Sequence, residues 1–124
     1  MRAAGLPQWP PGFEGRAQDR VSGEDLRSLT FSRTWIGHYS TKKNENFPFM
    51  LQSDDRGRVF YRSSQAFLAG VIDIEDDQVC IRFESDLPNT RLCGPVYRAG
   101  AADGHDTGYV YVFPLGPRFF SLKK

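Results

Sequence analysis

The sequence lacks the features that would assign it to several large functional classes. It has no stretch of the roughly 18–20 consecutive apolar residues that a membrane-spanning helix needs. We therefore expect no transmembrane segment, which leaves peripheral association with a membrane complex open. Sixteen Lys and Arg residues against fifteen Asp and Glu give a net charge of +1, without the basic excess typical of nucleic-acid-binding proteins. The balance of charge predicts that nucleic acid is not a partner.

Sequence motifs of common enzymes are also missing. The chain has no P-loop, no GxSxG elbow, no HExxH pair and no CxxC pair. His105 lies in a polar loop, and an acidic group from Asp73 to Asp77 surrounds a turn, where we expect solvated charges. A hydrolase that uses His38 with a carboxylate is the weakest alternative. We therefore expect a protein that is not an enzyme, with no catalytic residues, no metal site and no cofactor.

The first 21 residues lack the apolar periodicity of a regular element. Trp9 and Phe13 lie there among several prolines, which predicts an irregular arm. No apolar stretch of about 7–15 residues follows Arg2, so the arm does not have the pattern of a signal peptide. We expect either a cytosolic protein or the mature form of a secreted one. Trp9 and Phe13 are expected to pack on the domain or to dock on a partner.

Helical periodicity is nearly absent as well, and only one short segment shows it. Ser22 is a suitable N-cap residue, acidic residues follow it, and Leu26 and Leu29 lie three apart on one helical face. This pattern predicts a helix of at most two turns over residues 22–29. The two leucines are expected to plug one end of the domain that follows.

From Phe31 onward, apolar and polar residues alternate with the period of β-strands, and turn residues recur about every 8–12 residues. No helical segment separates the strands, so the pattern favours an antiparallel meander. Residues 22–124 are expected to form a single all-β domain, either a curved sheet or an up-and-down barrel of about eight strands. The predicted strands are Phe31–Ser40, Phe47–Ser53, Arg58–Arg62, Phe67–Ile74, Gln78–Ser85, Arg91–Arg98, Tyr109–Pro114 and Arg118–Leu122.

The chain has only two cysteines, Cys80 and Cys93, and their positions favour a disulfide. They lie almost equally far from the turn Asp86–Asn89, on the strands either side of it. Val79 takes the core face of the first strand and Leu92 that of the second, so both cysteines occupy the opposite face. This geometry suits a cross-strand disulfide, which implies a periplasmic or secreted protein; reduced cysteines would instead imply the cytoplasm.

Several short motifs carry a family resemblance. They are Leu26-Arg27-Ser28-Leu29, Thr34-Trp35-Ile36-Gly37, the turn Asp55-Arg56-Gly57, the block from Gly70 through Asp76-Asp77 to Cys80, and Cys93 with Val96, Tyr97 and Arg98. Over residues 22–98 the chain resembles small periplasmic proteins that are common in proteobacteria, although Ile72 stands where that family has tryptophan. The resemblance implies a secreted β-domain. Because the members are mostly of unknown function, it implies no catalytic residues.

Aromatic residues are abundant, at 14% of the chain. Along Tyr109, Tyr111 and Phe113 both faces of the predicted strand are apolar, so it is either covered on both sides or part of a contact surface. We expect an accessory module of a larger assembly, which binds a protein partner through these three residues and the arm with Trp9 and Phe13. The alternative is a lipocalin-like barrel that carries a small apolar ligand or haem.

Overall fold

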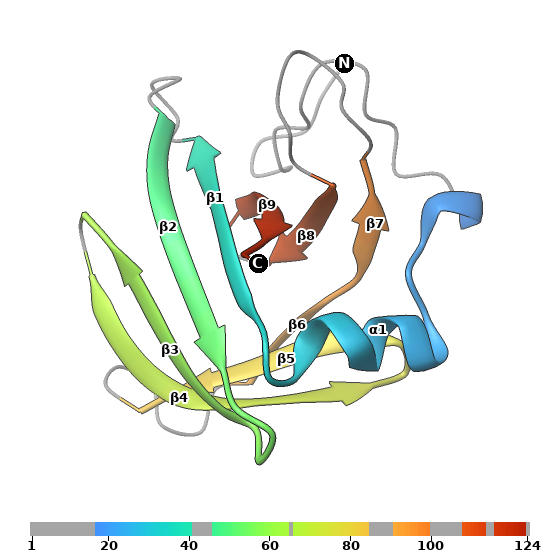
Figure 1. Ribbon diagram of the computed structural model, residues 1–124, viewed down its shortest axis with the longest axis horizontal. Coiled ribbons are helices and arrows are strands. Elements are labelled where there is room, and N and C mark those ends of the chain that lie inside the picture. Colours follow the sequence, from blue (N-terminus) through green and yellow to red (C-terminus); the bar gives the residue numbers. More distant parts are fainter. Residues whose placement is uncertain are drawn as a thin grey trace.

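A computed structural model describes residues 17–40, 46–64, 66–84, 91–99, 108–113 and 116–123, which leaves Trp9 and Phe13 outside the described residues. In this part of the chain nine antiparallel strands form one sheet that curls into a nearly closed barrel (Figure 1). The predicted all-β, up-and-down architecture is confirmed. The strands are β1 (Thr34–Ser40), β2 (Asn46–Ser53), β3 (Arg58–Ser63), β4 (Phe67–Glu75), β5 (Gln78–Phe83), β6 (Leu92–Gly94), β7 (Val96–Arg98), β8 (Tyr109–Phe113) and β9 (Gly116–Leu122).

The sheet closes because its first strand meets its last. Strands β1 to β6 pair in sequence order, β7, β8 and β9 do the same, and β9 pairs with β1. The two ends of this order, β6 and β7, are separated along the chain only by Pro95. The predicted strand Arg91–Arg98 is therefore two strands, since proline has no N–H to donate to a ladder. The Pro95 carbonyl instead accepts the N–H of Val112 at 2.9 Å, where the chain leaves β5 and joins β8.

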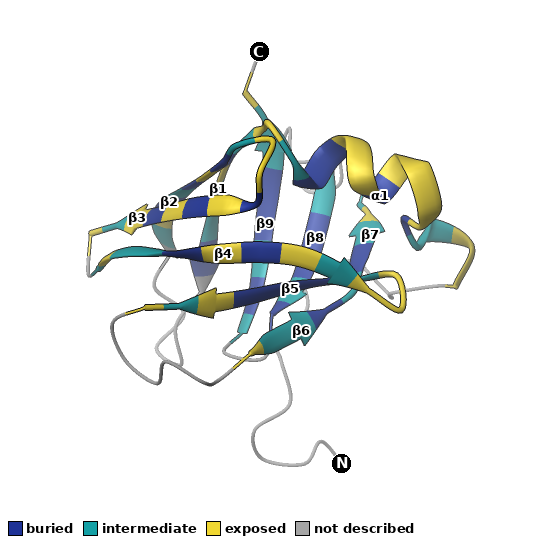
Figure 2. Ribbon diagram, turned by 90° about the horizontal axis from the view of Figure 1, so that it is seen from below, coloured by how far each residue is buried: buried dark blue, intermediate teal, exposed yellow. Residues whose placement is uncertain are grey.

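The side chains alternate between the interior of the barrel and its outer face, as the bands of buried and exposed residues along β4 show (Figure 2). Three fully or almost fully buried aromatic side chains fill the interior nearest the helix. The ring of Trp35 stacks on that of Phe120 with centroids 3.9 Å apart, and Tyr111 meets Trp35 edge-on at 5.5 Å. This cluster joins β1, β8 and β9, which are the strands around the closing pair.

The helix α1 (Gly23–Thr30) covers one end of the barrel. The prediction that Leu26 and Leu29 plug this end is confirmed, since both are buried in the core. Ser22 is the N-cap, but its side chain makes no capping hydrogen bond. The carboxylate of Asp77, from the turn between β4 and β5, accepts the N–H of Gly23 at 3.1 Å instead. The N-terminus of the helix is therefore capped by a residue of the barrel. Capping rules consider only residues near the helix in sequence and so do not predict this contact.

The carbonyl groups at the C-terminal end of α1 are also satisfied from outside the helix. Such groups have no partner within a helix and must find donors elsewhere. The donors are Nε of Arg33 to Ser28 at 2.9 Å, Nε1 of Trp35 to Leu29 at 2.6 Å, and Oγ of Ser53 to Thr30 at 2.6 Å. These three bonds fix the helix against β1 and β2.

The segment before α1 packs on the barrel too. It contains the 3-10 helix η1 (Ala17–Asp19), after which Val21 is fully buried and its N–H donates to the Val96 carbonyl at 2.8 Å. Arg20 donates from Nη2 to the carbonyl of Asp77 at 3.0 Å. Residues directly ahead of the expected domain start at position 22 thus contact β7 and the β4–β5 turn. Neither described helix has the length and apolar character that crossing a bilayer requires.

Candidate functional site

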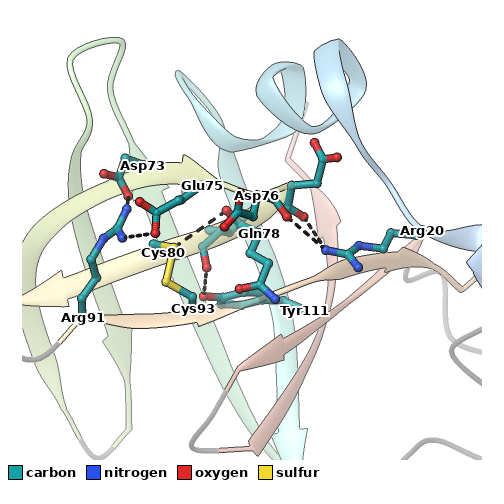
Figure 3. Close-up of a disulfide and its surroundings, with 11 residues drawn as sticks. Arg20, Asp73, Glu75, Asp76, Gln78, Cys80, Arg91, Cys93 and Tyr111 are labelled. Atoms are coloured by element: carbon teal, nitrogen blue, oxygen red, sulfur yellow. Dashed lines mark hydrogen bonds and ion pairs between the residues drawn. A yellow bond between two sulfur atoms is a disulfide. The ribbon is translucent and has the colours of Figure 1, made fainter.

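The two cysteines form the predicted disulfide, on the outer face of β5 and β6 (Figure 3). Cys80 and Cys93 are direct cross-strand partners, with Cα atoms 4.0 Å apart. The prediction succeeded because the turn position and the side-chain alternation of both strands pointed to the same pairing. Cys93 lies two residues before Pro95, so the bond ties β6 to β5 close to the point where the chain changes partners.

Arg91 forms two ion pairs beside this disulfide. Its Nη2 lies 2.8 Å from Oδ1 of Asp73 and its Nη1 lies 2.8 Å from Oε1 of Glu75 (Figure 3). The hydrogen bonds to Asp73 and Glu75 raise the pKa of the Arg91 guanidinium above its usual value. Asp73 is also the cross-strand partner of Cys80, which is 1% exposed. The side chains of Asp73 and Glu75 are 59% and 60% exposed, so these charges are solvated as expected, while the buried Cys80 has the surroundings of a structural disulfide.

Removing the disulfide in the variant Cys80→Ala/Cys93→Ala is expected to lower the free energy of unfolding by about 3 kcal/mol. The physical reason is that the bond closes a loop of about 14 residues and so restricts the unfolded chain. Urea unfolding followed by circular dichroism measures the change. The matched comparison is the wild type unfolded with and without a reductant. A decrease in the free energy of unfolding below about 1 kcal/mol would contradict a structural role for the disulfide.

The structure places the predicted docking residues of β8 inside the barrel. Tyr111 is 2% exposed and Phe113 6%, so both rings are covered in this structure. Val110, which faces the other way, is buried as well, and β8 is therefore covered on both sides. The Tyr111 hydroxyl donates to the Val79 carbonyl across the barrel at 2.9 Å, and burial raises the pKa of this phenol above its usual value. Docking through Tyr109, Tyr111 and Phe113 stays a prediction.

Of the two histidines, the structure describes only His38. His38 is half-buried on β1, and its ring lies against that of Phe119 with centroids 5.2 Å apart. His105 lies outside the described residues. Within the described ranges, no three His, Cys, Asp or Glu side chains gather in a way that could hold a metal ion.

Exposed apolar side chains gather instead on the outer face of the sheet. Among the described residues the four large ones are Phe67, 68% exposed, Phe60, 50% exposed, and Ile36 and Val71, both 41% exposed. The strand register makes the group on β3 and β4 continuous, because Phe60 faces Ala69, which lies between Phe67 and Val71 on the same face of β4. Ile36 extends it across β2 through its partner Met50.

Arginines flank these apolar side chains. Arg62 is the cross-strand partner of Phe67, and Arg82 is that of Val71. Neither forms an ion pair with a described residue, whereas Arg58 pairs with Asp54 at 2.8 Å. We call the surface formed by Ile36, Phe60, Phe67 and Val71 with Arg62 and Arg82 the outer apolar face.

A second cluster, around Arg118, lies inside the barrel. The Arg118 guanidinium carbon lies 4.3 Å from the ring centroid of Tyr39 and 5.4 Å from that of Phe113. Its Nη1 donates to the Gly116 carbonyl at 2.9 Å, and its Nε is buried with no hydrogen-bond partner among the described residues. Burial raises the pKa of the nearby Tyr61 phenol, and the positive charge of Arg118 opposes that shift.

Arg118 was not predicted as a site residue. The signal was present in the sequence, because Arg118 lies two residues before Phe120 and therefore shares its inward face. A charged residue in phase with core residues is unusual in a strand and can be found by that phase alone. The two structural features left without an assigned role are thus the outer apolar face and the Arg118 cluster.

Comparison with known proteins adds no assignment. No family model matches the chain, and no curated protein or solved structure was found that is similar to it. The resemblance to small periplasmic proteins stays a prediction.

Proposed function

We propose that this protein is a non-catalytic binding module that docks on a protein partner through its outer apolar face. The observation that carries the proposal is the exposure of Phe60 and Phe67 side by side with Val71. Contiguous exposed apolar side chains of this kind commonly mark interaction sites. Burying each of them against a partner would contribute about 1.5–3 kcal/mol.

The charges on this face indicate the chemistry of the partner. Arg62 and Arg82 have no described carboxylate to neutralise them, and a guanidinium suits an interface because it can bind a carboxylate through two parallel hydrogen bonds. The proposed partner therefore presents an apolar surface flanked by Asp or Glu side chains. Association should slow as the salt concentration rises, since the charges steer the encounter.

The proposed location is the periplasm or the outside of the cell. The Cys80–Cys93 disulfide supports it, because disulfides persist chiefly in oxidising compartments. The arm that carries Trp9 and Phe13 is proposed as a second contact with the same partner, although it lies outside the described residues.

The alternative, a carrier of a small apolar ligand or haem, is less well supported at the α1 end of the barrel. There the rings of Trp35, Tyr111 and Phe120 occupy the interior and contact one another. The support for ligand binding lies at the opposite end, around Arg118.

The proposal is tested by affinity purification from the native host with the full chain as bait. We expect a single partner in stoichiometric amount, and its recovery should fall more than about tenfold with Phe60→Ser/Phe67→Ser, the loss of two buried rings. Glu24→Ser/Arg27→Ser, on the exposed side of α1, is the control and should recover as much partner as the wild type. Docking through this face would be refuted if the wild type and both variants recovered equal amounts of the partner. It would also be refuted if no partner were recovered in stoichiometric amount.

A further inference from the structure

The positively charged guanidinium of Arg118 lies among aromatic rings. A charge in such surroundings is stabilised by a nearby group of opposite charge. A buried cation is costly unless paired, and no described carboxylate forms an ion pair with Arg118. The contacts with the Tyr39 and Phe113 rings supply part of the compensation through the cation–π interaction. In the described part of the chain, the buried Nε still lacks an acceptor.

The cluster lies at the end of the barrel away from α1. Tyr39 is near the end of β1, Phe113 ends β8, and Arg118 lies near the start of β9. Successive antiparallel strands bring these ends to the same rim. Residue 118 as a whole is only half-buried, so part of the side chain reaches solvent at this rim.

Inward-facing apolar side chains at the same rim are also only half-buried. They are Phe47 near the start of β2, Leu68 near the start of β4 and Phe83 at the end of β5. The rings of Phe47 and Tyr39 have centroids 5.7 Å apart, and those of Phe83 and Tyr61 6.0 Å. At the α1 end the corresponding inward residues Trp35 and Val59 are fully buried. Half-buried apolar side chains also occur toward the α1 end, at Ile74, Tyr109 and Leu122, so the feature that distinguishes the far rim is the inward-facing guanidinium of Arg118 beside them.

We infer that this rim binds a small apolar molecule that carries a carboxylate group. The carboxylate would accept hydrogen bonds from the Arg118 guanidinium, and the apolar body would cover Phe47, Leu68 and Phe83. A carboxylate matches the single positive charge and the planar shape of the donor. The site lies inside the barrel, so it is separate from the outer apolar face and does not rest on the proposed docking.

Decanoate and decanol are suitable probes, because they share an apolar chain and differ in charge. In isothermal titration calorimetry of the full chain at neutral pH, decanoate is expected to bind at a single site. Decanol should bind about tenfold to a hundredfold more weakly, which is the range for losing hydrogen bonds to a charged group. Absence of saturable decanoate binding, or equal affinity for the two probes, would overturn the inference.

Two variants test whether Arg118 is the residue that binds the carboxylate of decanoate. Arg118→Met removes the charge and keeps an unbranched side chain, so decanoate should then bind no better than decanol. Arg62→Met removes an exposed arginine of the outer apolar face and should leave decanoate binding unchanged. Equal losses in both variants would overturn the assignment to Arg118.

A measurement on the wild type covers the case in which Arg118→Met does not fold. Decanoate should shift the NMR signals of the Leu68 methyl groups and of the Phe47 and Phe83 rings. The ring signals of Phe60 and Phe67 should stay in place. The reverse pattern would place the probe on the outer apolar face and refute the rim site.

Discussion

Trp35→Ala is expected to lower the free energy of unfolding by about 3–5 kcal/mol, the range for removing a large buried aromatic side chain. Trp35 is fully buried and stacks on Phe120, so the substitution leaves a cavity between β1 and β9. It also removes the donor to the Leu29 carbonyl at the end of α1. The carbonyl that loses its partner accounts for about 1–3 kcal/mol of this loss. Urea unfolding followed by circular dichroism measures the sum.

Trp35→Phe separates the two contributions, because it keeps a ring in the stack and removes only the donor and part of the volume. We expect a cost of about 1–3 kcal/mol for this variant. The control is Phe60→Ala, an aromatic truncation on the exposed side of the same sheet, which should change stability by no more than about 0.5 kcal/mol. Similar losses for Trp35→Ala and Phe60→Ala would show that the indole does not lie inside the barrel.

The parts of the fold that were predictable depend on neighbours in sequence. Alternation along each strand and the turn residues between strands are local signals, and they located the meander and the pairing of Cys80 with Cys93. The helix was predictable for the same reason, although its N-terminal partner was not. Asp77 reaches Gly23 only because the β4–β5 turn lies against α1.

Closure of the barrel is the step that local patterns did not reveal. It depends on β9 meeting β1, and it covers Tyr111 and Phe113, for which the sequence alone allowed a contact surface as well. It also splits the predicted strand Arg91–Arg98, because Pro95 lies where the chain changes partners. The inward phase of Arg118 was visible in the sequence, but its neighbour Tyr39, from the other side of the closing pair, was not.

Gly37→Ala tests closure directly, with an expected loss of at least about 4 kcal/mol in the free energy of unfolding. Gly37 lies on β1 in register with Phe120 of β9, and a Cβ atom there would overlap the backbone carbonyl of Phe119. A backbone atom cannot move aside as a side chain can, so β1 and β9 would have to separate. Losses of this size are rare for single substitutions and indicate disruption of the core or backbone.

The matched control is Gly108→Ala, just before β8, where an added Cβ would meet nothing within 4 Å. That change should leave stability unaltered or raise it by up to about 1 kcal/mol, because alanine restricts the unfolded chain more than glycine does. Urea unfolding of both variants gives the comparison. If Gly37→Ala were as stable as Gly108→Ala, β1 and β9 could not lie as close as the register requires. The sheet would then be open at that pair, and Arg118 would lose the Tyr39 ring that holds it in the interior.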